Sequence, residues 1–328
     1  MSNRAKARSV SSVFRRALDN PRAIPGAAGS LARARLNDAF ETVLYAQYGR
    51  PTNQLTEDWD NLLVLDACRY DTFATVATLE GDLDYRISPG SATLEWLANA
   101  VSDRTYHDTV CVTAQPRLAR YESQFHAVDH VWDRGWDEEL KVTPPGPVVD
   151  GILAAREEYP NKRLYAHFMQ PHTPYIGEFA REHVGIRTGD AAGRDRAMGE
   201  EVSDEDWYHA IDAFEDGKIS KGVLLKAYAE NLRLALDAVE GLLETLDGKT
   251  VITADHGDLF GERAWPVPWR GFDHPPGVPA LKLRQVPWFT VDGERRRVTS
   301  EDPRASGGMD DDYVSERLQQ LGYVEEGT

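Results

Sequence analysis

Cysteine is scarce in this sequence of 328 residues, which contains only Cys68 and Cys111. Two thiols cannot form a disulfide framework, and Cys68 follows an apolar run typical of a buried strand, so we expect a reducing compartment. The sequence also lacks any run of about 18 apolar residues and any apolar segment after its first arginines. These absences predict a soluble chain without a membrane span or signal peptide, located in the cytoplasm.

Lysine is also scarce: 8 of the 37 basic residues are Lys and 29 are Arg, and 54 acidic residues give a net charge of −17. An acidic surface repels phosphate backbones, which argues against nucleic acid as a partner. An acidic, lysine-poor surface suits a cytosol of high salt, where like charges are screened, and indicates an archaeal source. A GC-rich genome, which also favours Arg over Lys, is the alternative explanation.

The N-terminal segment departs from this acidic balance. Residues 1–36 hold eight basic residues and one acidic residue, a net charge of +7. The segment is either an arm that contacts an anionic membrane surface or an acidic partner, or a frayed tail. Pro21, Pro25 and Gly26 would interrupt a helix, which favours the tail. We therefore divide the chain into a basic arm with its lead-in, 1–57, and one α/β domain, 58–328.

Four short apolar runs, each separated from the next by stretches of helical spacing, predict buried parallel strands. This alternation indicates a doubly wound, mostly parallel α/β sheet with helices on both faces. The longest helix is expected over 219–246, a closing helix over 311–322, and a lid-like insertion over about 176–218. The expected strands are 61–66, 109–113, 163–169 and 249–255.

Polar residues directly after these runs are the first candidates for a site, because ligands of open parallel sheets bind at the carboxyl ends of the strands. Asp66 ends the first run, and Asp255 and His256 end the last, where Gly257 permits a turn. Two carboxylates and an imidazole suit Zn²⁺ or Mn²⁺ better than Ca²⁺, although Mg²⁺ or Ca²⁺ is not excluded. As a structural alternative, Asp66 is a helix N-cap.

Hydroxyl groups precede a predicted helix in the segment 88–97. Ser91 or Thr93 is suited to nucleophilic attack, because a metal lowers the pKa of a hydroxyl and backbone N–H groups stabilise anionic charge. N-capping is the structural alternative for both. His172, between two prolines, is suited to binding an anion or protonating a leaving oxygen. His274, in a second stiff loop, is a weaker candidate for a ligand or an anion contact.

Taken in order, these motifs resemble the alkaline phosphatase superfamily, specifically its sulfatase-like branch. The strand end 66–69, the turn 90–93, the Pro-His-x-Pro-Tyr segment 168–175 and the Asp-His-Gly segment 253–262 carry the resemblance, which runs from about 61 to 287. It implies the fold of that superfamily.

The resemblance also implies roles for individual residues. A divalent metal would be bound by Asp66, Asp255 and His256. Thr93 would be the nucleophile and would also coordinate this metal, and Ser91 is the second candidate for the nucleophile. His172 would contact the transferred group or its leaving oxygen. The anion or a second metal would be contacted by His172, His274 and Arg69.

Two departures from the family restrict the expected activity. Formylglycine sulfatases carry Cys-x-Pro-x-Arg or Ser-x-Pro-x-Arg at the nucleophile turn, and the residues from Thr93 to Leu97 lack both the Cys and the Pro. The second-metal segment Asp-x-x-x-His is absent beside His172, which favours one ion over two. We expect a metal-dependent hydrolase or transferase of small anionic phosphate or sulfate esters with a covalent threonine intermediate. The alternative is a non-catalytic descendant that binds an anion or a partner. The sequence does not indicate an oligomeric state.

Overall fold

The computed structural model describes residues 24–184, 210–268 and 270–303, with only the backbone from 24 to 34. The chain divides into two compact units, residues 1–49 and 50–328, which are described separately. The first contains α2 (Ile24–Tyr48). The expectation that Pro25 and Gly26 interrupt any helix was wrong, because Pro25 occupies the first helical turn, where its missing N–H has no helical partner. No helix among the described residues is long and apolar enough to cross a membrane.

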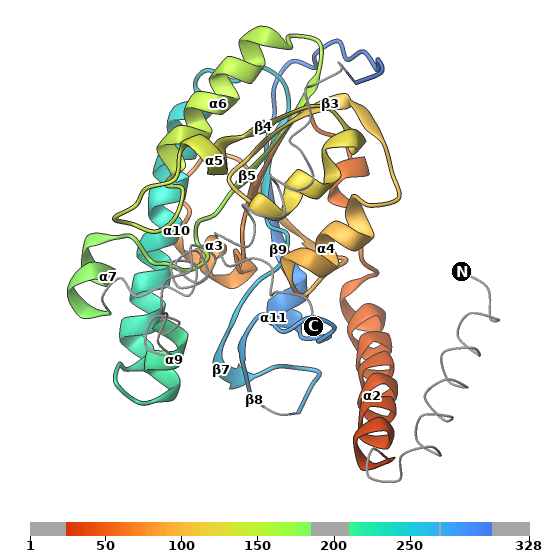
Figure 1. The fold of residues 1–328 in the computed structure, drawn as a ribbon, viewed down its shortest axis with the longest axis vertical. Coiled ribbons are helices and arrows are strands. Elements are labelled where there is room, and N and C mark those ends of the chain that lie inside the picture. The colour runs from red at the N-terminus through yellow and green to blue at the C-terminus, as the bar shows by residue number, and fades with distance from the viewer. Residues whose placement is uncertain (1–23, 185–209, 269, 304–328) are drawn as a thin grey trace, which may run out of the picture. The chain divides into compact units, whose positions relative to one another are not determined.

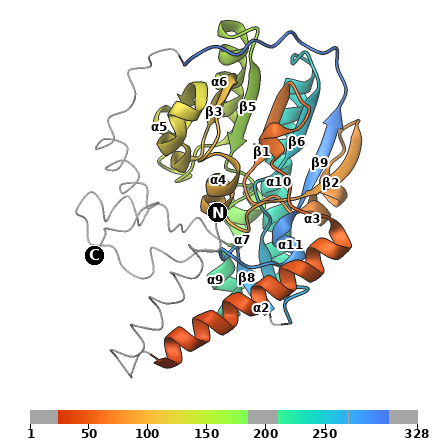
Figure 2. The ribbon, with the colours of Figure 1, turned by 90° about the vertical axis from the view of Figure 1, so that its right-hand side faces the viewer.

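The second unit is built on a seven-stranded sheet of order β2-β9-β6-β1-β5-β3-β4 (Figure 2). The five strands from β6 to β4 are parallel, and β9 runs antiparallel to both β6 and β2. The predicted mostly parallel α/β sheet is thereby confirmed. The strands are β1 (Asn61–Leu65), β2 (Asp82–Ile87), β3 (Tyr106–Thr113), β4 (Phe125–His130), β5 (Arg163–Phe168), β6 (Thr250–Thr253) and β9 (Gln285–Val291).

Helices cover both faces of the sheet, with α6 and α10 on one side and α4 on the other (Figure 1). Alternate residues of β1 serve the two faces: Leu63 and Leu65 belong to the apolar cluster of the first side, Leu62 and Val64 to that of the second. Every residue of β1 is therefore buried. The helices are α3 (Tyr70–Val76), α4 (Thr93–Ala100), α5 (Val131–Arg134), α6 (Pro145–Glu158), α10 (Lys221–Leu243) and α11 (Leu281–Arg284), with 3-10 turns Gln54–Thr56 and Pro116–Gln124.

A smaller apolar cluster lies beside the main core. It joins α7 (Glu178–His183) and α9 (Ala210–Glu215) to the start of α10 and to the hairpin of β7 (Leu259–Arg263) and β8 (Arg270–Asp273). The predicted insertion 176–218 thus contains two short helices where it is described. Three predicted features lie wholly or partly outside the described residues: residues 185–209 of the insertion, the helix 311–322, and residues 1–23 of the basic arm.

Candidate functional site

The turn after β1 places Asp66 at the carboxyl end of the strand. Ala67, the next residue, has a left-handed φ of 59°, a conformation that is strained for a residue with a Cβ. Partners on other elements hold it there: its N–H donates to Asp255 Oδ1 (3.1 Å), and its carbonyl accepts from the Tyr228 hydroxyl of α10 (2.7 Å). Asp66 is 1% exposed.

Asp255 and His256 follow β6 and are fully buried. The Asp255 Oδ1 atom accepts from the His256 backbone N–H (2.8 Å) as well as from Ala67. Gly257 is needed here for space, since a Cβ would lie 2.1 Å from the Lys282 carbonyl oxygen. Its N–H donates to the Leu283 carbonyl (2.8 Å), which ties the turn to α11.

Four side chains converge at this point. His256 Nε2 lies 3.1 Å from Thr93 Oγ1, 3.4 Å from Asp255 Oδ2 and 3.7 Å from Asp66 Oδ1. The structure therefore brings together the four residues that the sequence predicted as metal ligands and nucleophile, from three segments widely separated in the chain.

The donor atoms of this group suit a cation. His256 Nδ1 donates to the Gly257 carbonyl (2.8 Å), and burial lowers the pKa of the imidazole, so Nε2 presents a lone pair. Asp66 Oδ1 and Asp255 Oδ2 are buried and accept no hydrogen bond from any described residue. Burial would raise the pKa of Asp66, but the neighbouring histidines outweigh it and hold that pKa well below its usual range. Burying two carboxylate oxygens without a hydrogen bond or a positively charged partner lowers the stability of the fold.

Ser91 and Thr93 occupy different environments. Thr93 begins α4 and faces His256, whereas Ser91 Oγ lies 2.8 Å from Glu95 Oε2 and 2.9 Å from the Pro275 carbonyl oxygen. The Ser91 hydroxyl is thus engaged in fastening the start of α4 to a neighbouring loop. Of the two hydroxyls, only that of Thr93 contacts the Asp–His group, which consists of Asp66, Asp255 and His256.

The loop of His172 is held by Asn231, a fully buried residue of α10. The Asn231 amide donates to the carbonyls of Pro171 (3.2 Å), His172 (3.0 Å) and Pro174 (3.3 Å). His172 Nδ1 donates to the Thr173 carbonyl (2.6 Å), which leaves Nε2 for a ligand. The expectation of a stiff loop therefore has a physical basis in this single amide as well as in the prolines.

His274 joins the two other histidines. Its ring lies 4.6 Å from that of His256 and 4.9 Å from that of His172, centroid to centroid. Burial would lower the pKa of His274, but its bond to Asp273 outweighs this and raises the pKa to about 9, so the ring is positively charged at neutral pH. The ligand atoms of Asp258, Asp273 and His274 lie close together, as do those of Asp66, His167 and Asp255. A protonated His274 has no lone pair for a cation, and burial raises the pKa of Asp258 to about 7, so the group that contains His274 is poorly suited to a cation at neutral pH.

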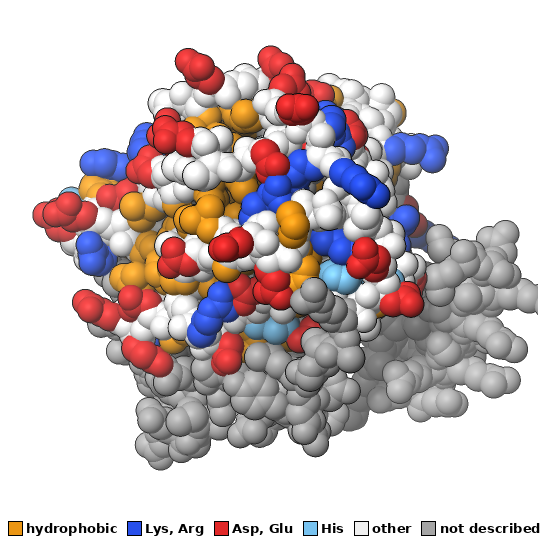
Figure 3. All heavy atoms as spheres, turned by 90° about the horizontal axis from the view of Figure 1, so that it is seen from above, with side chains coloured by type: hydrophobic (Ala, Val, Ile, Leu, Met, Phe, Trp, Pro, Cys, Tyr) orange, Lys and Arg blue, Asp and Glu red, His pale blue; other side chains and the backbone are white. Residues whose placement is uncertain are grey.

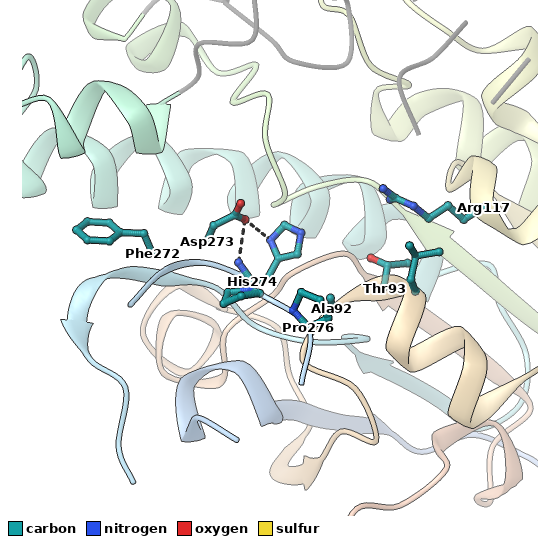
Figure 4. Close-up of a pocket in the computed structure, with 9 residues that line it drawn as sticks. Ala92, Thr93, Arg117, Phe272, Asp273, His274 and Pro276 are labelled. Carbon is teal, nitrogen blue, oxygen red and sulfur yellow. Dashed lines mark hydrogen bonds and ion pairs between the residues drawn. The ribbon is translucent and has the colours of Figure 1, made fainter. Parts of the chain in front are cut away.

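A pocket of about 370 Å³ is lined by Asp273, His274 and Thr93. In Figure 4, Thr93 and Arg117 lie on one side of it and Asp273 and His274 on the other. The remaining walls are mostly apolar, so a charged ligand would find its polar partners at these few residues. The lining residues are Ala92, Thr93, Leu94, Arg117, Phe272, Asp273, His274, Pro275 and Pro276.

Three polar residues near the site were not singled out from the sequence. Arg117 lines the pocket, and Gln115 and His167 contact Asp66 from the other side. A polar residue inside an apolar strand is the signal that could have found His167, which lies in β5. Arg69, expected as an anion contact, is instead 5% exposed and ion-paired with Asp71 (2.8 Å) and Glu262.

No protein-family model and no curated protein matches the sequence. Among solved structures, the chain is similar to the integral membrane lipooligosaccharide phosphoethanolamine transferase A from Neisseria meningitidis, with 12% identity and a TM-score of 0.42, over 97% of this chain and 66% of that one. It is also similar to the C-terminal periplasmic domain of EptC from Escherichia coli, solved with zinc, with 12% identity and a TM-score of 0.44, over 75% of this chain and 77% of that one. This chain thus spans just under two thirds of the full-length Neisseria protein.

These names correct two expectations. The similar chains include periplasmic domains and a membrane protein, all from bacteria, which contradicts the predicted cytoplasmic location and archaeal source. The reasoning failed because two buried cysteines and an acidic surface are compatible with more than one compartment. Neither expectation is carried further.

Proposed function

We propose that this chain is a metal-dependent enzyme of the alkaline phosphatase superfamily that transfers or hydrolyses a phosphoester through a covalent intermediate on Thr93. The observation that carries the proposal is the placement of the Thr93 hydroxyl 3.1 Å from His256 Nε2, next to two buried carboxylate oxygens that accept no hydrogen bond from any described residue. A hydroxyl beside a set of bare metal-ligand atoms is the arrangement that metal-activated nucleophiles require.

Asp66, Asp255 and His256 would hold the cation, with Thr93 as the fourth contact. Two carboxylates, one imidazole and one hydroxyl suit Zn²⁺ or Mn²⁺ better than Mg²⁺ or Ca²⁺, which prefer oxygen-only sets. One ion at these residues accounts for the orphaned oxygens. When bound, such an ion lowers the pKa of a contacting hydroxyl and neutralises charge on a phosphoryl oxygen.

The reaction then follows from the chain's own residues. The Thr93 oxygen, having lost its proton to solvent, forms a bond to phosphorus while the bond to the ester's leaving oxygen breaks. In this proposal His172 supplies the proton that the departing oxygen takes up. The phosphoryl group then leaves Thr93 for an acceptor. The reaction is a hydrolysis if the acceptor is water and a transfer if it is an alcohol.

Positive groups of the pocket would bind the anionic substrate. The His274 ring is protonated at neutral pH, and Arg117 brings a guanidinium to the same pocket as Thr93. Arg69 is left out of this set because it does not line the pocket, and it pairs with Asp71 and Glu262. Phosphoesters are favoured over sulfate esters, because Thr93 cannot form the aldehyde hydrate of the formylglycine sulfatases.

A panel of p-nitrophenyl phosphate, bis-p-nitrophenyl phosphate and p-nitrophenyl sulfate tests the proposal, with the full chain loaded with Zn²⁺ or Mn²⁺. We expect release of p-nitrophenol from a phosphoester, its loss in Thr93→Ala, and its retention in the matched variant Ser91→Ala. Intact-mass analysis should detect the adduct on Thr93. A chain that takes up neither Zn²⁺ nor Mn²⁺ and turns over no ester would instead support the non-catalytic alternative.

A further inference from the structure

The carboxylate of Asp66 is held unequally at its two oxygens. Oδ2 accepts from Gln115 Nε2 (2.7 Å) and lies 3.5 Å from His167 Nε2, whereas Oδ1 accepts nothing from the described residues and lies 3.7 Å from His256 Nε2. One oxygen is therefore fixed from behind, and the other faces the group that contains Thr93.

We infer that Gln115, His167 and Tyr165 form a buried support, the Asp66 clamp, which fixes Oδ2 and thereby aims Oδ1 at the cation. The inference rests on the proposed function, in which Asp66 is a metal ligand. The three residues are positioning residues: they act through Asp66 and touch neither substrate nor metal.

The sheet itself builds the clamp. Asp66, His167 and Gln115 come from the neighbouring strands β1, β5 and β3 or the turns that follow them, and His167 is in register with both Val64 and Thr113. Tyr165 and His167 are two residues apart on β5 and so point to the same face. Both are completely buried.

The orientation of the Gln115 amide is determined by its other bond. Its Oε1 accepts from the Arg117 backbone N–H (3.3 Å), so the NH₂ group is the end that meets Asp66. The hydrogen bond from Gln115 Nε2 to Asp66 Oδ2 has a charged acceptor, and hydrogen bonds to charged acceptors are stronger than those between neutral groups.

The proton positions on His167 follow from Tyr165, whose hydroxyl lies 2.7 Å from His167 Nδ1. Burial raises the pKa of Tyr165 well above its usual range, so the phenol keeps its proton, and it donates that proton to Nδ1. The imidazole proton is then on Nε2, facing Asp66 Oδ2. In the opposite assignment, the lone pair of Nε2, which has no hydrogen-bond partner among the described residues, would face Asp66, and His167 would be a metal ligand beside Asp66 and Asp255. At 3.5 Å the N–H attracts the carboxylate electrostatically but is too distant for a good hydrogen bond.

The test uses the full chain and Zn²⁺, with the Kd measured by competition with a chromophoric chelator. Tyr165→Phe removes the donor to His167, and Gln115→Leu removes the bond to Asp66. Each should weaken Zn²⁺ binding by about 10- to 100-fold. The matched controls Tyr106→Phe and His126→Gln alter a buried tyrosine and a buried histidine that contact other parts of the fold, and should bind as the wild type does.

The absorption spectrum of the Co²⁺-loaded chain gives a second readout, because it reports the number and kind of ligands. His167→Gln should keep the wild-type band positions and intensities, since a positioning residue contributes no ligand. A spectrum of changed coordination in His167→Gln would show that His167 binds the metal itself and would overturn the inference. If that variant fails to fold, the Kd values of Tyr165→Phe and Gln115→Leu decide alone.

The failure of the inference and that of the proposed function give different results. If the wild type binds Zn²⁺ and loses it in Asp66→Asn, but Tyr165→Phe and Gln115→Leu bind as tightly as the wild type, only the clamp is refuted. If the wild type takes up no metal, both the clamp and the proposed function are refuted.

Discussion

The two ends of the central sheet differ in the partners that they give to their carboxylates. At the amino ends of the parallel strands, acidic residues have basic partners: Asp247 pairs with Arg156 (2.6 Å) and Arg296 (3.4 Å), and Asp60 pairs with Arg295 (2.9 Å). Seen from this end, red and blue side chains lie next to one another (Figure 3). At the carboxyl ends, Asp66 and Asp255 have only histidines as basic neighbours among the described residues, and each keeps a bare oxygen, as Asp60 Oδ1 also does. The difference between the ends is therefore the arginine partner: paired charge stabilises the fold, and charge without an arginine is kept for chemistry.

The largest expected difference between the ends comes from removing one charge at each. Asp255→Asn should abolish stoichiometric metal binding and activity, while the metal-free chain unfolds at the same temperature or higher, because one of two adjacent buried carboxylates becomes neutral. Asp247→Asn should lower stability and leave metal binding unchanged. Metal analysis and thermal unfolding of both variants measure this, and equal effects on metal content would break the comparison.

Thr93→Ala gives the next largest effect and acts on chemistry alone. Turnover should fall by roughly 10⁴-fold or more, because no other hydroxyl contacts the side chains of Asp66, Asp255 or His256 among the described residues. The Kd for Zn²⁺ should change far less, since the two carboxylates and His256 remain. Steady-state kinetics with chelator competition separate the two quantities. Full activity in Thr93→Ala together with its loss in Ser91→Ala would transfer the role to Ser91.

Arg296→Met should affect the opposite end only. The Arg296 side chain is 5% exposed and donates to the Asp60 carbonyl (2.8 Å) and to Asn61 Oδ1 (2.9 Å). Its loss leaves the buried Asn61 Oδ1 without this donor, whereas the Asp60 carbonyl still accepts from the Leu164 N–H (2.9 Å). The expected cost is about 1–3 kcal/mol in the free energy of unfolding. Denaturant titration measures that cost, and Arg233→Met, at an exposed position of α10, is the control. Impaired metal binding in Arg296→Met would show that the ends are coupled.

The smallest effect is the acid sensitivity of the amino end. Hydrogen bonding to Arg156 lowers the pKa of Asp247 from its ordinary value of 3.8. The native state therefore binds fewer protons than the unfolded chain, and the stabilisation is present above about pH 4 and lost as the pH falls through the lowered pKa. Arg156→Ala should flatten this part of the pH–stability curve. An unchanged curve would mean that the pair contributes nothing.

The residues at the strand ends were the part of the site that the sequence could predict. Apolar runs show where the strands end, and ligands of open parallel sheets bind at the carboxyl ends of the strands, so only the local sequence pattern is needed. Asp66, Asp255 and His256 were singled out this way, and Thr93, together with Ser91, as a hydroxyl before a predicted helix; the structure places Thr93 beside the other three. The antiparallel pair β2 and β9 was missed, since β2 is largely exposed and lacks an apolar run. Gln115, His167 and Arg117 were missed because their significance lies in contacts across strands. The role of Asn231 in holding the His172 loop also needed the tertiary structure.

The most direct test of the central claim is anomalous diffraction at the zinc edge from crystals of the full chain grown with Zn²⁺. The account predicts the strongest peak within about 2.0–2.2 Å of Asp66 Oδ1, Asp255 Oδ2 and His256 Nε2, with Thr93 Oγ1 beside it. Crystals whose zinc lies at other residues, or that hold none, would contradict it.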